Sequence, residues 1–153
     1  MRAVYSPDPM RYLALDLGEK RIGVALSDET ATLASGLDTL TRTGGRKDLQ
    51  AVADLVRRHQ PAAVVVGLPL NMDGTAGAQA EKVRTFIEGL KARIAVPVVE
   101  RDERLTTVEA HEILRKSGVA WSQRAALLDK VSAVVILQEY LDEMRASAGR
   151  PAS

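Results

Sequence analysis

The unbroken apolar run "AAVVVGLPL", residues 62–70, restricts the fold of this chain more than any other segment. It has no alternating polar positions and contains three consecutive valines, a pattern typical of a strand covered on both faces of a sheet. The run is too short to cross a bilayer. Apolar residues at helical spacing precede it in residues 46–60 and follow it from Val83 to Ile94. A buried strand between two helical segments predicts an α/β domain.

The rest of the chain adds strands and helices in a definite order. Strands are predicted at residues 11–17 and 21–27, joined by a hairpin turn, with a third, more polar strand at 36–43. After the central run come a strand at 96–103, a helix from Thr106 to about residue 118 with Glu109 in a capping box, and a long helix at 123–144. We therefore predict a mixed five-stranded sheet, three antiparallel strands followed by two parallel strands, with helices on both faces.

A single domain, residues 10–145, accounts for this pattern in a chain of 153 residues. Residues 1–9, where Pro7 and Pro9 block regular structure, are expected to form a flexible extension, and residues 146–153 a mobile tail. The first residues lack the long apolar core of a signal peptide. We therefore expect a cytoplasmic protein that does not bind membranes.

Composition excludes several classes of site. The chain has no cysteine, which excludes disulfides, thiolate zinc sites, iron–sulfur clusters and cysteine nucleophiles. The 21 basic and 20 acidic residues nearly balance, so a strongly basic scaffold is excluded while a local basic face is not. With one Phe, one Trp and three Tyr, the chain also has few rings on which single-stranded bases could stack.

Acidic residues at three places in the chain are hard to explain by folding alone. Asp16 interrupts the first apolar strand, although it could also be a turn residue that accepts hydrogen bonds from the amides of residues 18–20. Asp102 and Glu103 end the last predicted strand, where a solvated strand end beside a helix start is the alternative. The sequence leaves both interpretations open for each position taken alone.

Asp129 lies on the last predicted helix, on a face that is otherwise packed. Its neighbours at helical spacing are Ser132, Ala133 and Ile136. Burying an uncompensated carboxylate there costs several kcal/mol. A salt bridge to Arg124, Lys130 or a residue of the sheet is the alternative explanation.

If these acids converge, their mutual repulsion calls for a cation. Oxygen ligands without cysteine favour a hard ion, Mg²⁺ or Mn²⁺, and a carboxylate-held ion suits phosphodiester hydrolysis. Four polar residues near the acids or at a strand end are candidate nucleic-acid contacts: Lys20, Arg21, Asn71 and Arg104. For the three bases the alternative is charge balance on a mixed surface, and for Asn71 it is turn chemistry alone.

Four blocks of the sequence resemble the YqgF family, which belongs with the RuvC-like resolvases in the RNase H-like superfamily. They are "LALDLGEKRIGVALSD", "VVVGLPLNMDGT", "DERLTTVEA" and "LLDKVSAVVILQEYL", and the resemblance extends over residues 10–141. It implies an RNase H-like fold and a bacterial cytoplasmic nuclease that needs Mg²⁺ or Mn²⁺. The family's role is maturation of the 5′ end of the small-subunit ribosomal RNA precursor, whereas relatives in the superfamily cut Holliday junctions.

Residue by residue, the resemblance implies an acidic site at Asp16, Glu103 and Asp129, with Asp102 as a secondary candidate. RuvC-type resolvases carry a further acid one turn along the last helix, where this chain has Ser132. The implied substrate is therefore structured RNA, with branched DNA as the alternative, and the implied partner is a ribosomal precursor particle. A two-fold dimer would suit a symmetric junction, and the sequence leaves a homodimer open.

Two rival functions remain at this stage. The first hairpin also resembles the phosphate motif of the actin, Hsp70 and sugar-kinase superfamily, but those proteins need two such domains and a second motif. A ribosome-assembly factor that binds RNA without cleaving it is the second rival. A chain of that kind would be expected to have lost one of the three acids, and this chain retains all of them.

Overall fold

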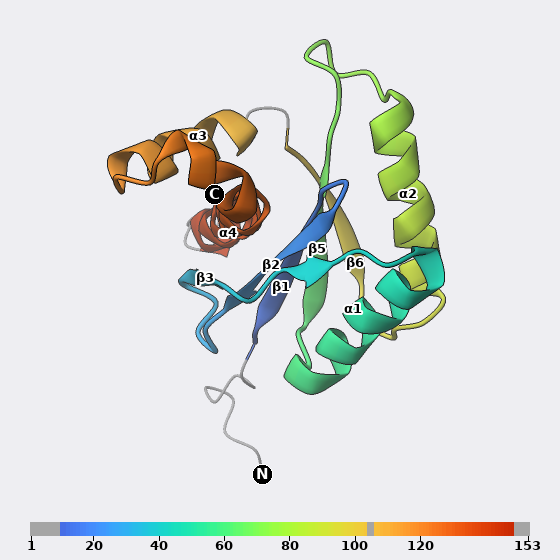
Figure 1. The fold of residues 1–153 in the computed structure, drawn as a ribbon. Coiled ribbons are helices and arrows are strands. Elements are labelled where there is room, and N and C mark those ends of the chain that lie inside the picture. The colour runs from blue at the N-terminus through green and yellow to red at the C-terminus, as the bar shows by residue number, and fades with distance from the viewer. Residues whose placement is uncertain (1–9, 104–105, 149–153) are drawn as a thin grey trace.

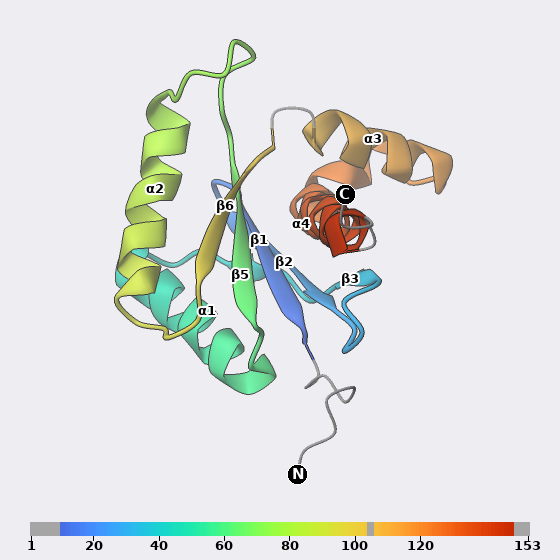
Figure 2. The same cartoon turned by 180° about the vertical axis from the view of Figure 1, so that it is seen from behind.

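The computed structural model describes residues 10–103 and 106–148, except the side chains of residues 106–108, 121–122, 125–126 and 148. One central sheet carries helices on both faces (Figures 1 and 2). The strands are β1 (Tyr12–Leu17), β2 (Arg21–Ser27), β3 (Ala34–Gly36), β4 (Leu40–Thr41), β5 (Ala63–Leu68) and β6 (Val98–Asp102). The helices are α1 (Gly45–His59), α2 (Ala78–Lys91), α3 (Thr106–Lys116) and α4 (Trp121–Ala148).

The sheet has the predicted mixed topology. Its order is β3-β2-β1-β5-β6, with β1 antiparallel to β2 and parallel to β5, and β5 parallel to β6. In place of the single strand predicted at 36–43, the structure has two short strands, β3 and β4, which pair separately with β2. Leu37 and Leu40 both pack against the same core. Since residues three apart on one strand point to opposite faces, a continuous strand could not bury both of them.

Alternation along β1 decides which side of the sheet each of its residues faces. Leu13 and Leu15 join the core beneath α1 and α2, whereas Tyr12 and Ala14 join the core beneath α4. The next residue of this second series is Asp16, which therefore faces α4 and is only 9 % exposed. The apolar strand β1 is thus covered on both faces, with one carboxylate near its end.

The last helix is longer than its apolar pattern suggested. It was expected at residues 123–144 and extends from Trp121 to Ala148. Alanines at its end are strong helix formers, so the helix continues into the segment expected to be a tail. Residues 1–9, the expected extension, and 149–153 lie outside the described residues. In the described part of the chain, no helix is both long and apolar enough to cross a membrane.

Candidate active site

The three acids singled out from the sequence lie together at one end of the sheet. Asp16 comes from β1, Glu103 follows β6 directly, and Asp129 comes from α4, which crosses that face. The Asp16 carboxyl shares hydrogen bonds with both Glu103 and Asp129. The backbone amide of Glu103 donates to the carbonyl oxygen of Leu68 at 3.1 Å, which anchors that residue beside the end of β5. Three segments far apart in the sequence therefore supply one carboxylate cluster.

Burial raises the pKa of all three carboxyls, and repulsion between like charges adds to this for Asp16 and Glu103. Burial is the largest cause that raises the pKa of Asp16 far above its ordinary value, and the charges of Glu103 and Asp129 add to it. Burial also raises the pKa of Glu103, with further contributions from Asp129 and Asp102. The pKa of Asp129 is raised by burial as well, although Arg21 opposes that change. In the metal-free protein, Asp16 is therefore protonated at neutral pH, and its single O–H donates a hydrogen bond within the cluster.

Glycines on neighbouring strands make the space for this cluster. A Cβ at Gly23 on β2 would lie 1.9 Å from the backbone carbonyl oxygen of Asp129, so α4 touches the sheet where the acid is attached. A Cβ at Gly67 on β5 would lie 2.6 Å from Oε2 of Glu103. At Gly18, after β1, it would lie 2.7 Å from both carboxylate oxygens of Asp129. Each glycine therefore permits the approach of one acid to the centre of the site.

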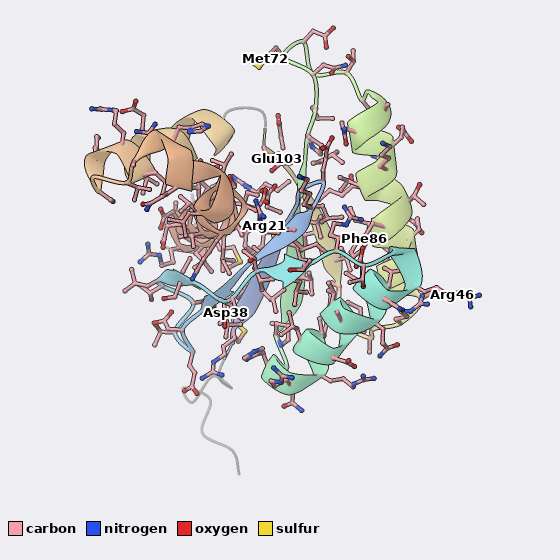
Figure 3. The ribbon with its side chains drawn as sticks, viewed as in Figure 1. Arg21, Asp38, Arg46, Met72, Phe86 and Glu103 are labelled. Carbon is pink, nitrogen blue, oxygen red and sulfur yellow. The ribbon has the colours of Figure 1, made fainter. Side chains whose placement is uncertain are left out.

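A cleft of about 640 Å³ opens beside the acids. Figure 3 labels Glu103, which follows β6, and Arg21, the first residue of β2. The carboxyl ends of parallel strands, where ligands bind in α/β proteins, meet at the end of the sheet where the acids lie. The residues that line the cleft are Asp16, Leu17, Gly18, Glu19, Arg42, Pro69, Gln79, Lys82, Val83, Glu103 and Asp129. The carboxylate cluster thus faces an open space large enough for a ligand.

Comparison with known proteins identifies the family. Residues 10–143 match the model of the RuvX family, described as "Holliday junction resolvase". The chain belongs to the RuvX family. This confirms the resemblance to the YqgF family that the sequence motifs suggested.

Two curated relatives of the RuvX-family chain bear the name "Putative pre-16S rRNA nuclease". The protein of Syntrophus aciditrophicus is 49 % identical over 133 residues, which cover 87 % of this chain and 89 % of the relative. That of Thermoanaerobacter pseudethanolicus is 43 % identical over 137 residues, which cover 89 % and 99 % of the two chains.

Solved structures confirm the fold of this RuvX-family chain. RuvC of T. thermophilus, solved in complex with a Holliday junction substrate, superposes with a TM-score of 0.58 at 20 % identity and covers 92 % of this chain and 97 % of its own. The resolvase of Fowlpox virus gives 0.57 at 16 % identity, covering 88 % and 99 %. The predicted RuvC-like, RNase H-like sheet is therefore present.

The predicted basic contacts are spread over different environments. Arg21 lies 4.0 Å from Oδ2 of Asp129, so part of its role is the sheet-to-helix ion pair that was the alternative explanation for that acid. Lys20 is exposed in the hairpin turn. Arg104 lies outside the described residues.

Three other predicted residues lie beside the cleft lining rather than in it. Asn71 donates through Nδ2 to Oγ1 of Thr75 at 3.0 Å and packs against Gly77, so it organises the loop after β5. Asp102 is exposed on β6 and acts on the site through its charge, which raises the pKa of Glu103. Ser132 is buried on α4, one turn after Asp129.

Sequence reasoning missed the far side of the cleft, formed by Arg42, Gln79 and Lys82. No motif marks these residues, because they come from a loop and a helix whose relation to β1 appears only in three dimensions. The three glycines carried a signal that was not used. A glycine inside a strand often marks the close approach of another backbone, and Gly23 and Gly67 both lie within strands.

The chemistry of the carboxylate cluster fits a divalent ion. Within the described residues, no group of three acidic or histidine side chains already has the spacing of a metal-ligand set. Asp16 is nonetheless buried and hydrogen-bonded to the partly buried Glu103 and Asp129. The three acids offer only oxygen ligands, and the ionisation of Asp16 is strongly disfavoured. A hard cation in place of the Asp16 proton would compensate the repulsion.

Proposed function

We propose that this chain is a divalent-metal-dependent nuclease that hydrolyses phosphodiester bonds in the precursor of 16S ribosomal RNA. Mg²⁺ or Mn²⁺ would be held by Asp16, Glu103 and Asp129. The observation that carries the proposal is that these carboxylates, from β1, the end of β6 and α4, share one hydrogen-bonded cluster that lines an open cleft. Repelling carboxylates are costly for folding, and metal binding gives them a reason to be retained.

The bound ion would activate a water molecule and stabilise the leaving oxygen of the phosphodiester. The protein's own residues fix the geometry. Asp16 is held in a central strand, paired opposite Gly23 in the β1–β2 register. Arg21 favours the ionised form of Asp129, and the tight contact at Gly67 restricts the position of Glu103. Positioning of this kind is what a metal site needs for in-line attack.

The names of the relatives support pre-16S rRNA as the substrate. A ribosomal precursor particle in the cytoplasm is the setting that we propose for this substrate. The family description favours a second candidate, cleavage of branched DNA. Against it stands Ser132, where resolvases of the RuvC type resemble this helix but have an acid. A homodimer is proposed only for that second activity, since a symmetric junction calls for two sites.

The decisive assay incubates the full chain with precursor 16S RNA, other structured RNA and four-way DNA junctions, with Mg²⁺, Mn²⁺ or EDTA. Glu103→Gln and Asp129→Asn are each expected to lower the rate of cleavage about a hundredfold or more, because a ligand of the ion is lost. Glu100→Gln on β6 and Asp142→Asn on α4 are the matched controls. Both control residues are exposed, at ion pairs away from the cleft, and should leave the rate unchanged.

Cleavage at the wild-type rate in EDTA, or in either cluster variant, would overturn the metal-dependent mechanism. RNA binding without cleavage under every condition would favour the assembly-factor alternative. Cleavage of the four-way junction alone would replace the RNA substrate with branched DNA. The three outcomes differ in their substrate and metal requirements, so one set of reactions separates them.

Metal affinity is expected to rise with pH. The pKa of Asp16 is raised in the folded, metal-free protein by burial and by Glu103 and Asp129, and Arg21 lies beside Asp129, so the ion must displace a proton at neutral pH. The apparent dissociation constant for Mn²⁺ should therefore fall up to about tenfold per pH unit for each proton displaced. Calorimetric titrations at several pH values, in buffers of different ionisation enthalpy, measure both the affinity and the protons released. Affinity that is independent of pH would contradict the shared-proton cluster.

A further inference from the structure

Arg42 is fixed in the cleft by contacts on three sides. It follows β4, and its Nε lies 3.1 Å from Oδ2 of Asp48, a side chain that is only 4 % exposed. Its Nη1 donates to the carbonyl oxygen of Gly18 at 2.9 Å, two residues beyond Asp16. The guanidinium carbon lies 6.0 Å from the centroid of the Phe86 ring. A long cationic side chain that would otherwise be mobile is therefore held at one place beside the acids.

The anchor of this arginine is itself built into the fold. Asp48 is in the first turn of α1 and accepts the backbone amide of Thr43 at 2.9 Å. Burial opposes its ionisation, but this amide and the guanidinium outweigh that effect and lower its pKa. Asp48 is thus ionised at neutral pH, and Arg42 still has guanidinium N–H groups without a protein acceptor among the described residues.

A second cation lies on the same wall. Lys82 on α2 is exposed, lines the cleft, and makes no ion pair within the described part of the chain. Gln79, one turn earlier, lines the cleft beside it and can donate through its amide. Because α2 and α4 lie on opposite faces of the sheet (Figure 1), these residues approach the cleft from the side opposite Asp129.

We propose that Arg42 and Lys82 form a phosphate-binding wall that holds the backbone of a single nucleic-acid strand next to the scissile phosphate. This inference rests on the proposed nuclease function. It adds the path of the bound nucleic-acid strand, which passes between the acids and α2. Arg and Lys bind phosphate oxygens through charge-assisted hydrogen bonds, and such contacts set the position of a strand without reading its sequence. The acids alone would repel the phosphates on either side of the cut.

The test measures binding of a short single-stranded RNA oligonucleotide as a function of salt concentration. All proteins carry Asp16→Asn, so that the RNA stays intact. Each phosphate contact on a single strand contributes a slope of about −0.7 to log K against log salt. Lys82→Gln should therefore make the slope shallower by about 0.7 and weaken binding about fivefold at 0.1 M salt. Lys91→Gln, another exposed lysine on α2 that does not line the cleft, is the matched control.

Adding Arg42→Gln should make the slope shallower by about 1.4 in total. Because Arg42 also partners the buried Asp48, circular dichroism must show that this double variant is folded at the assay temperature. If it is not, the single Lys82→Gln variant decides the question. Lys82→Arg keeps the positive charge, so it should have the same salt slope as the parent protein, which carries Asp16→Asn alone.

The proposal is overturned if Lys82→Gln has the same salt slope as Lys91→Gln, or if the parent protein does not bind the oligonucleotide. Both results can occur while the wild-type enzyme still cleaves RNA. In that case the proposed nuclease function is retained and the proposed phosphate-binding wall is rejected. A wild-type protein that cleaves no nucleic acid overturns the proposed function instead. The salt slope then still shows whether the wall binds phosphates.

Discussion

Gly23→Ala is expected to destabilise the protein by about 3 kcal/mol or more, the upper end of the cost of overpacking a core. The added Cβ would lie 1.9 Å from the carbonyl oxygen of Asp129 and 2.2 Å from its carbonyl carbon. These are backbone atoms of a long helix, so no side chain can rotate away, and α4 must move off the sheet. Urea denaturation of the two proteins gives the difference directly.

The same displacement should reduce catalysis. Asp129 would move with its helix, and a shift of about 1 Å in a catalytic group can cost a hundredfold in rate. Gly45→Ala is the control, because a Cβ at that first residue of α1 meets nothing within 4 Å. It should leave both stability and cleavage close to those of the wild type. A Gly23→Ala protein with wild-type stability would show that α4 does not pack as closely as described.

The sequence predicts most of the fold because the apolar patterns are unambiguous. The run at 62–70 is typical of a strand covered on both faces, and its residues 63–68 form β5. The strand that was predicted incorrectly, at 36–43, is the most polar of the predicted strands. In the structure, β3 and β4 pair with β2 over only a few residues. The break between them depends on Leu37 and Leu40 both reaching the same core, a tertiary requirement that overrides a local strand pattern.

The acids could be predicted because they oppose folding, whereas most of their surroundings could not. Asp16 is conspicuous in an apolar strand, and the structure shows that it is buried and shares hydrogen bonds with Glu103 and Asp129. Lys82 is one of several exposed bases on its helix, and nothing local distinguishes it. Its place on the cleft depends on how α2 packs over the sheet. The alternation of side chains along a strand does not explain why residue 23 is a glycine. The helix that needs the space beside Gly23 is more than a hundred residues away in the sequence.

Asp16→Asn is expected to have opposite effects on activity and stability. Cleavage should fall about a thousandfold or more, because an ion ligand at the centre of the cluster is lost, an effect of several kcal/mol on the transition state. The metal-free protein should become more stable by on the order of 2 kcal/mol, which raises Tm by about 4–8 °C. An amide has two N–H groups and can donate to both Glu103 and Asp129, whereas the protonated carboxyl has one O–H, and the amide carries no cost of ionisation.

The way in which the stability gain of Asp16→Asn changes with pH follows from the raised pKa of Asp16. Its pKa is raised by burial and by two like charges, so the folded state holds a proton that the unfolded chain releases above about pH 4. The wild-type carboxyl therefore loses stability as pH rises, and the advantage of Asp16→Asn in EDTA should be larger at pH 8 than at pH 5. Thermal unfolding of both proteins across this range measures the difference.

Asp48→Asn is the matched comparison, because it changes an acid that is also buried but is satisfied by protein donors. Burial is outweighed there by the Thr43 amide and the Arg42 guanidinium, which lower the pKa of Asp48. Its ionised form stabilises the fold above about pH 4 and loses that contribution as pH falls. Asp48→Asn should thus destabilise the protein by about 1–3 kcal/mol at neutral pH. If both variants destabilised the metal-free protein, Asp16 would be an ordinary structural acid, and the case for a metal-binding cluster would fail.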